Sequence, residues 1–112
     1  MANFYKLDSD AIDLAVTQKS PGVYALDRTT SPGFKVNYIG RADDDVARRL
    51  KQWAAEGYYK YFQFEYYSTA KAAFERECHL YHIHPNLDNV IHPARPENTS
   101  YSCPVVGCRA LR

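Results

Sequence analysis

The stretch GVYALDRTTSPGFKVNYIG, residues 22–40, decides the fold because two short apolar segments flank a Ser-Pro-Gly sequence. Serine, proline and glycine in succession are typical of a turn. Valine, tyrosine and isoleucine on either side favour β-strands. We therefore predict a β-hairpin with strands at 22–27 and 35–40.

The two ends of this hairpin mirror each other in sequence, as Gly-Val-Tyr and Tyr-Ile-Gly. We expect Tyr24 to pair with Tyr38, a register that places Gly22 opposite Gly40. Paired glycines contribute no side-chain contact, but they leave room near the backbone for a neighbour or a ligand. The hairpin is then either packed scaffold alone or half of a functional site.

The rest of the chain predicts a regular order of elements. Apolar periodicity and capping residues indicate helices at 9–19, 43–57 and 70–84. Alternating side chains in 58–68 predict a third strand. The order is α-β-β-α-β-α, followed by an irregular tail at 90–112, so the fold class is α/β (α+β).

Length and composition are those of one soluble domain spanning residues 1–112. No apolar run could cross a membrane and the N-terminus does not resemble a signal peptide, so we expect a cytoplasmic protein without a membrane partner. The net charge of +1 argues against binding nucleic acid by bulk electrostatics. Three cysteines argue for reduced thiols or a metal site rather than a disulfide framework.

One glutamate in the last helix falls on the wrong face. At about 100° per residue, Glu77 lies roughly 60° from Phe74, inside the apolar arc, whereas Glu75 lies outside it. A carboxylate there is costly unless it is paired, hydrogen-bonded or bound to a metal. Glu77 is therefore either a metal ligand or half of a buried salt bridge to an arginine.

The middle helix distinguishes two neighbouring arginines in the same way. Arg49 borders the apolar stripe, whereas Arg48 points to water. A guanidinium at the border of the core is well suited to holding a phosphate. The alternative is a surface arginine whose stem covers apolar neighbours.

These residues together resemble the motifs of the GIY-YIG nuclease family. The matching positions, in chain order, are Gly22, Val23, Tyr24, Tyr38, Ile39, Gly40, Val46, Arg49, Leu50, Glu77, Leu80, Tyr81, Pro85 and Asn89. Each triplet alone is a weak signal, but their order and their agreement with the helical faces make the combination specific. The resemblance covers residues 21–89, which form the core of the domain.

The resemblance implies a small three-stranded antiparallel sheet flanked by helices, with DNA as substrate. It implies hydrolysis of phosphodiester bonds by water, with a single Mg²⁺ or Mn²⁺ ion held by Glu77. Tyr24 would help to activate the water and Tyr38 would position the water or the phosphate. Arg49 would brace the phosphate, and Asn89 would support the metal side.

The chain departs from the family pattern at several positions. Arg41 directly follows the second triplet, and we expect it to contact phosphate as well. Two spacings differ by one residue, so Arg48 and Glu75 stay alternatives to the arginine and glutamate named above. Trp53 stands where family members often carry histidine or tyrosine. A catalytically inactive nucleic-acid-binding or scaffold module is therefore the alternative function.

Two physical conditions follow from this hypothesis. Tyr24 can act as a base at neutral pH only if a cation lowers its pKa from about 10. Glu77 has to lie near both tyrosines and an open crevice. A carboxylate neutralised by a guanidinium, remote from both phenols and without a crevice, would exclude the hypothesis.

The tail offers a separate metal chemistry. Cys103 and Cys108, with four residues between them, could bind Zn²⁺ together with two histidines. The other interpretation is a loop packed on the domain, with the cysteines as small hydrophobes. A zinc-stabilised interaction domain is therefore a further alternative. Because the net charge is small, sequence-specific cutting would need a homodimer or a partner protein.

Overall fold

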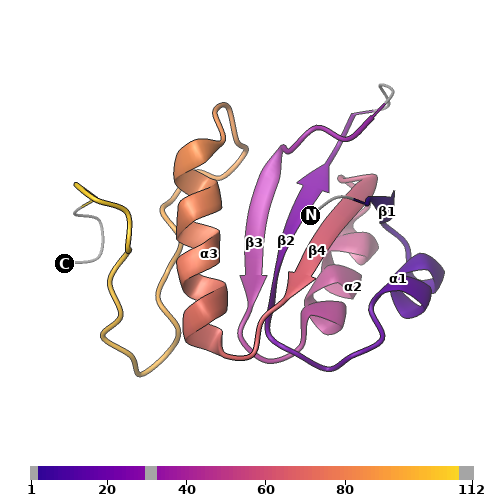
Figure 1. Ribbon diagram of the computed structural model, residues 1–112. Coiled ribbons are helices and arrows are strands. Elements are labelled where there is room, and N and C mark those ends of the chain that lie inside the picture. Colours follow the sequence, from indigo (N-terminus) through magenta and orange to yellow (C-terminus); the bar gives the residue numbers. More distant parts are fainter. Residues whose placement is uncertain (1–2, 30–32, 109–112) are drawn as a thin grey trace.

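A four-stranded antiparallel sheet lies at the centre of the structure, a computed structural model that describes residues 3–29 and 33–108 (Figure 1). The strands are β1 (Tyr5–Lys6), β2 (Gly22–Asp27), β3 (Tyr38–Ala42) and β4 (Tyr61–Tyr66), in the order β1-β4-β2-β3. The helices are α1 (Ser9–Ala15), α2 (Val46–Glu56) and α3 (Ala70–Ile83). The α+β class is confirmed.

Strand β2 is buried along its whole length because it has a helical layer on each face. Tyr24 and Leu26 pack into the core that includes residues of α1 and α2. Val23 and Ala25 pack instead against α3, on the opposite face (Figure 1). Apolar residues on both faces explain why the sequence of β2 is a nearly continuous hydrophobic run.

The predicted three-stranded sheet is wrong, because a fourth strand, β1, precedes the first helix and pairs with β4. At two residues, β1 is too short to show the alternation by which strands are recognised. Several predicted boundaries also move: the helix predicted at 43–57 spans Val46–Glu56, and the strand predicted at 58–68 spans Tyr61–Tyr66. The first helix ends at Ala15, and the strand predicted at 35–40 begins at Tyr38.

The predicted hairpin register is also wrong, by two residues. Tyr24 lies opposite Gly40, and Tyr38 lies opposite Leu26. A shift of two keeps every side chain on its expected face, because side chains alternate with a period of two. The reason is steric: the Tyr24 ring lies where a Cβ atom on residue 40 would be. The glycine thus makes room for the tyrosine.

A buried carboxylate shapes the hairpin connection. Asp27 accepts hydrogen bonds from the backbone N–H of Thr29 at 2.7 Å and from that of Lys35 at 3.0 Å. These bonds satisfy Asp27 where it is fully buried. The predicted Ser-Pro-Gly turn falls partly on residues 30–32, outside the described residues.

The two helices that carry the predicted site residues Arg49 and Glu77 begin at well-formed caps. Asp45 accepts a hydrogen bond from Arg48 N–H at 3.2 Å, and Thr69 accepts one from Ala72 N–H at 3.0 Å. Gly57 ends α2 with φ of 75°, a conformation that favours glycine. In the described part of the chain, no helix has the length and apolar character needed to cross a membrane.

The contact between Tyr24 and Gly40 can be tested by adding a single methyl group. Gly40→Ala introduces a Cβ that overlaps the Tyr24 ring, so we expect a loss of about 1–3 kcal/mol in the free energy of unfolding. Denaturant unfolding measures it.

The control is a double-mutant cycle with Tyr24→Ala. Without the ring, the added methyl group has space, so Gly40→Ala should cost much less in that background. An equal cost in both backgrounds would show that the steric explanation is wrong.

Candidate functional site

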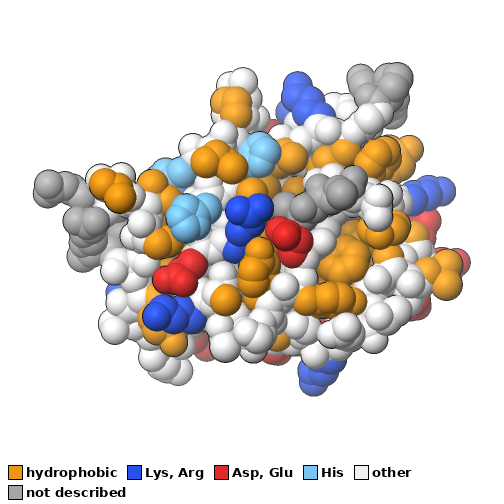
Figure 2. Space-filling view, in the orientation of Figure 1, with side chains coloured by type: hydrophobic (Ala, Val, Ile, Leu, Met, Phe, Trp, Pro, Cys, Tyr) orange, Lys and Arg blue, Asp and Glu red, His pale blue; other side chains and the backbone are white. Residues whose placement is uncertain are grey.

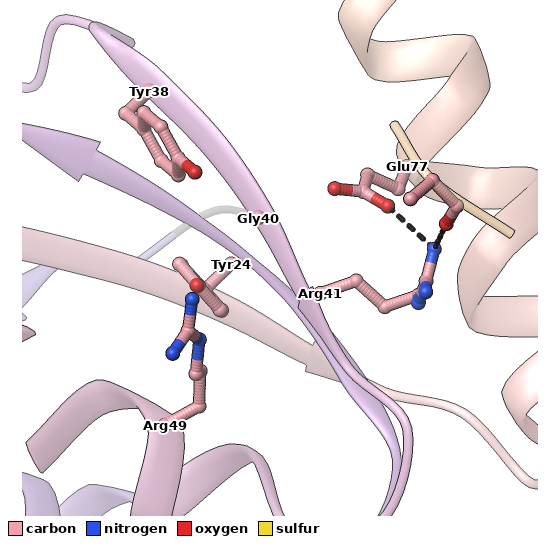
Figure 3. Close-up of a pocket in the computed structure, with 7 residues that line it drawn as sticks. Tyr24, Tyr38, Gly40, Arg41, Arg49 and Glu77 are labelled. Atoms are coloured by element: carbon pink, nitrogen blue, oxygen red, sulfur yellow. Dashed lines mark hydrogen bonds and ion pairs between the residues drawn. The ribbon is translucent and has the colours of Figure 1, made fainter. Parts of the chain in front are cut away.

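A cavity of about 160 Å³ opens at the edge of the sheet beside β3. Its lining residues are Tyr24, Tyr38, Gly40, Arg41, Arg49, Glu77 and Ala94 (Figure 3). Consecutive side chains of β3 point to opposite faces, so Tyr38 lies on the α2 side and Arg41 on the α3 side. Because β3 is an edge strand and residue 40 has no side chain, the cavity extends from the α2 face of the sheet to its α3 face.

Glu77 lies on α3 and is buried, as its helical position predicts. Its Oε1 accepts a hydrogen bond from Nη1 of Arg41 at 2.9 Å. The arginine partner that the sequence left open is therefore Arg41. Burial raises the pKa of Glu77 from 4.5 to about 7, although the charge and hydrogen bond of Arg41 act in the opposite direction.

Arg41 is held on several sides. Its Nη1 also donates to the carbonyl oxygen of Ala94 at 2.7 Å. Its Nε donates to Asp43, and its guanidinium carbon lies 5.3 Å from the centre of the Phe74 ring. These contacts commit the guanidinium to holding Glu77 and the tail. The phosphate contact expected of Arg41 would have to compete with them.

The second carboxylate oxygen of Glu77 faces the cavity. Figure 3 shows it directed away from Arg41, toward the side where Tyr38 and Tyr24 lie. Among the described residues it accepts no hydrogen bond. Of the three conditions that would exclude a metal site, only the neutralising guanidinium is met. The carboxylate shares a crevice with both phenols.

Tyr24 is buried, and its hydroxyl oxygen accepts a hydrogen bond from the indole N–H of Trp53 at 2.7 Å. Burial raises the pKa of Tyr24 to about 12, although the Trp53 hydrogen bond and the charge of Arg49 oppose the rise. The phenol is therefore neutral at pH 7 and keeps a proton to donate. The lowered pKa that a base would need is not provided by the protein alone.

Tyr38 is half-buried at the mouth of the same cavity. Its ring packs against Trp53, with 4.8 Å between the ring centres. Burial, and then the charge of Glu77, raise the pKa of Tyr38, so this phenol is also a hydrogen-bond donor at neutral pH.

The two arginines of α2 differ as their helical positions predict. The guanidinium of Arg49 lies beside the Tyr24 hydroxyl, where it lines the cavity (Figure 3). It also donates to Gln52 at 2.8 Å. Arg48 does not line the cavity and forms an exposed ion pair with Asp44 at 3.0 Å.

Both polar atoms of the Asn89 side-chain amide form hydrogen bonds with the backbone of β3. Its Oδ1 accepts from Ile39 N–H at 3.1 Å, and its Nδ2 donates to Ile39 C=O at 2.8 Å. Asn89 therefore holds the outer edge of β3 and lines a neighbouring cavity that shares Tyr38 and Glu77 with the first. This role is positional, whereas the sequence predicts support of a metal.

Two residues of the site were not predicted. The sequence marks Trp53 only as a departure from the family pattern, and it does not predict the hydrogen bond that the indole N–H donates to Tyr24. Its position four residues after Arg49, on the same helical face, is the signal that could have found it. Ala94 acts through its backbone carbonyl in an irregular segment, so no side-chain pattern marks it.

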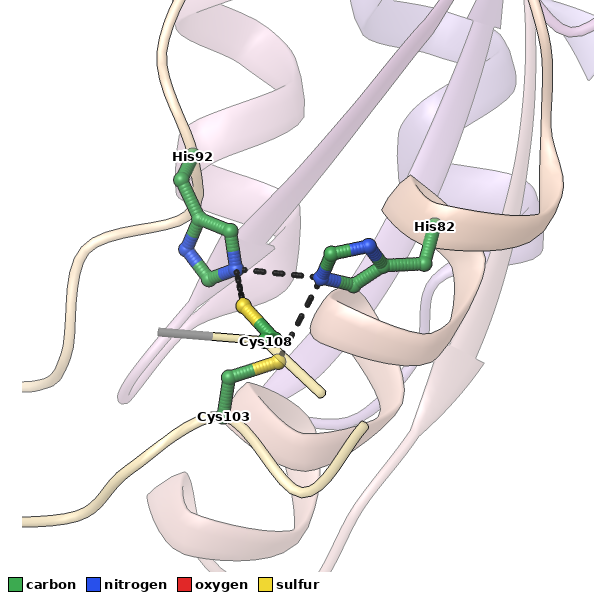
Figure 4. Close-up of side chains that lie close together, drawn as sticks. All are labelled: His82, His92, Cys103 and Cys108. Atoms are coloured by element: carbon green, nitrogen blue, oxygen red, sulfur yellow. Dashed lines mark hydrogen bonds between the residues drawn. The ribbon is translucent and has the colours of Figure 1, made fainter. Parts of the chain in front are cut away.

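A second cluster lies between α3 and the tail (Figure 4). The side chains of His82, His92, Cys103 and Cys108 bring four possible ligand atoms within 4.8 Å of one another. This set could bind a metal ion, and two sulfurs with two imidazoles are typical of zinc. The histidines that join the two predicted cysteines are thus identified.

The surface carries little concentrated positive charge on the face drawn in Figure 2. Its blue side chains are scattered, and histidines gather where α3 and the tail meet. This distribution agrees with the net charge of +1. It argues for few contacts with phosphates on that face.

No protein-family model matches the sequence, and no curated protein or solved structure is significantly similar to it. The motif resemblance to GIY-YIG nucleases is therefore an inference from the residues themselves. Function has to be inferred from the chemistry of the cavity.

The raised pKa of Glu77 predicts a specific pH dependence of stability. The Glu77 carboxyl keeps its proton up to about pH 7 in the folded state but only up to about pH 4.5 in the unfolded state. Stability therefore falls as the pH rises from 4.5 to 7. Between these two pH values, the free energy of unfolding of Glu77→Gln should rise relative to that of wild type by on the order of 3 kcal/mol. Unfolding by urea at several pH values measures this gain.

Glu75→Gln, on the same helix but outside the cavity, is the matched control and should show no such gain. A difference between Glu77→Gln and wild type that stays constant from pH 4 to pH 8 would contradict the raised pKa.

Proposed function

We propose that the cavity beside β3 hydrolyses phosphodiester bonds of DNA with the help of a divalent cation, as the resemblance to GIY-YIG nucleases implies. One observation carries the proposal. Tyr24, Tyr38, Arg49 and Glu77 come from β2, β3, α2 and α3, and all four line one cavity. The same four residues are the ones to which the motif resemblance assigns roles.

The cavity offers suitable donors for a phosphate. Arg49 is exposed and presents a guanidinium that can donate to non-bridging phosphate oxygens. The neutral phenols of Tyr24 and Tyr38 add hydroxyl donors on the same side of β3. Donors aimed at the charge that develops on a phosphate stabilise the transition state.

The free oxygen of Glu77 is the site for the cation. Mg²⁺ is often held by one or two carboxylates and several waters, so a single oxygen in an open polar cavity fits this ion. Arg41 carries a positive charge beside the carboxylate, which weakens cation binding and favours a site completed by the substrate phosphate. When bound, the cation polarises the phosphoryl group and lowers the pKa of a coordinated water.

In the protein alone, Tyr24 is a hydrogen-bond donor rather than a base. Arg49 and the indole N–H of Trp53 both act to lower the pKa of Tyr24, but burial keeps it near 12. Tyr24 therefore acts first as a hydrogen-bond donor that orients water or phosphate. Positive charge from a cation nearby would be needed before the phenolate could accept a proton at neutral pH.

A second function is favoured by the ion pair itself. Because Arg41 neutralises Glu77, the cavity could bind phosphate as a catalytically inactive nucleic-acid-binding or scaffold module. Such a module would bind DNA and cut no substrate with either Mg²⁺ or Mn²⁺. In both functions, recognition of a defined sequence would need a second copy or a partner protein.

Glu77→Gln provides the decisive variant, since it removes the charge that attracts the cation and keeps the shape of the side chain. We expect cleavage of linear, nicked, flapped or branched DNA to fall by about 10²–10³-fold or more, with DNA affinity within a few-fold of wild type. Gel assays with Mg²⁺ or Mn²⁺ measure both quantities. Turnover that survives in Glu77→Gln would rule out the proposed role.

Arg49→Ala and Arg48→Ala form a matched pair on consecutive positions of α2. The first removes a guanidinium that lines the cavity, so the cleavage rate should fall about 10²–10³-fold. The second removes an exposed ion pair and should leave the rate within a few-fold. Equal losses in the two variants would contradict the assignment of Arg49.

A further inference from the structure

The four side chains between α3 and the tail match the dimensions of one tetrahedral zinc site. His82 Nε2 and His92 Nε2 are 3.3 Å apart, and the sulfur-to-nitrogen distances are 3.5 Å from Cys103 to His82 and 3.4 Å from Cys108 to His92. Zn–N bonds of about 2.05 Å and Zn–S bonds of about 2.3 Å give tetrahedral edges of about 3.3 and 3.5 Å.

The surroundings of the cluster favour metal binding. His92 places Nδ1 2.9 Å from the carbonyl oxygen of Pro93, so an N–H there leaves Nε2 free as a ligand. Gly107, with φ of 86°, sits in the turn closed by Cys108 N–H and Val105 C=O at 3.1 Å, which returns Cys108 to the cluster. Four protein ligands leave no open position, as in structural zinc sites.

We propose that Zn²⁺ bound by His82, His92, Cys103 and Cys108 fastens the tail to α3 and thereby positions Arg41 and Glu77 in the cavity. His82 belongs to the last turn of α3, and the other three ligands belong to the tail. The ion therefore joins α3 to the tail (Figure 4). The same two segments meet again at the cavity.

The second meeting point is Ala94, two positions after His92. Its carbonyl oxygen accepts from Nη1 of Arg41 at 2.7 Å, and the same Nη1 donates to Glu77 at 2.9 Å. Glu77 precedes His82 on α3 by five residues, a rise of about 7.5 Å along the helix. The tail and α3 are thus joined at two places, by the zinc ion at one and by Arg41 at the other.

Side-chain and packing contacts, rather than a helix or a sheet, hold the described part of the tail in place. The described part after α3 contains no helix or strand, and its buried contact with α3 centres on Cys103, Phe74 and Cys78. Val90 and Val106 are 93% and 98% exposed. Ordering so long a segment costs conformational entropy, which metal binding can offset.

The first test is metal binding by the full chain under reducing conditions. We expect one zinc per chain by elemental analysis, and Co²⁺ substitution should give thiolate charge-transfer and tetrahedral d–d bands. Cys103→Ser combined with Cys108→Ser should abolish both signals, whereas His79→Ala, an exposed histidine on the same helix, should keep them. A wild-type chain that binds zinc no more tightly than the double variant would overturn the site.

The second test measures coupling to the cavity. Binding linkage is reciprocal, so if zinc positions Arg41, Arg41→Ala must weaken zinc affinity, and we expect about tenfold. Arg48→Ala is the control and should change the affinity less than twofold. Competition with a chromophoric chelator gives both values. Equal zinc affinity in wild type and Arg41→Ala would overturn the positioning role, whether or not the protein cuts DNA.

Hydrogen exchange provides an independent measurement if the cysteine variants do not fold. Chelation of zinc from the wild-type chain should accelerate amide exchange in residues 91–108 at least tenfold, while β2 stays protected. Unchanged exchange in that segment after confirmed zinc removal would overturn the proposal.

Discussion

The buried ion pair between Arg41 and Glu77 is the interaction on which the site depends. It connects the edge strand β3 to α3, and through Ala94 it also connects both to the tail. A buried ion pair contributes little net stability, because desolvation offsets the attraction, but it strongly disfavours arrangements that leave one charge alone. The pair therefore specifies the position of the carboxylate. Burial raises the pKa of Glu77 to about 7, so a proton would compete with the proposed cation for this carboxylate at neutral pH.

Because β3 is an edge strand, the ion pair between Arg41 and Glu77 lines an open cavity. Because Gly40 has no side chain, the Tyr24 ring can lie against its backbone. The cavity at this edge is lined by residues from both faces of the sheet. Trp53 then fixes the phenol from α2 through its indole N–H. The packing of the hairpin and the lining of the cavity are thus made by the same contacts.

The sequence predicted those parts of the fold that depend on local periodicity. Helix faces follow from a fixed angle per residue, so the burial of Glu77 and the different positions of Arg48 and Arg49 could be derived. Strand register and β1 depend on contacts between distant segments, which local patterns do not encode. The sequence indicated that Glu77 could form a buried salt bridge to an arginine. It could not identify Arg41 as the partner, because that depends on where the β3 edge lies relative to α3.

We propose that Glu77 has a pKa near 7 and offers an oxygen to a cation in the cavity. Carbon-13 NMR of the Glu77 carboxyl during a pH titration, with and without Mg²⁺, tests this most directly. We expect a midpoint near pH 7 without the ion and a lower midpoint with it, because the cation binds the ionised form. A midpoint near 4.5 that Mg²⁺ does not move would contradict it.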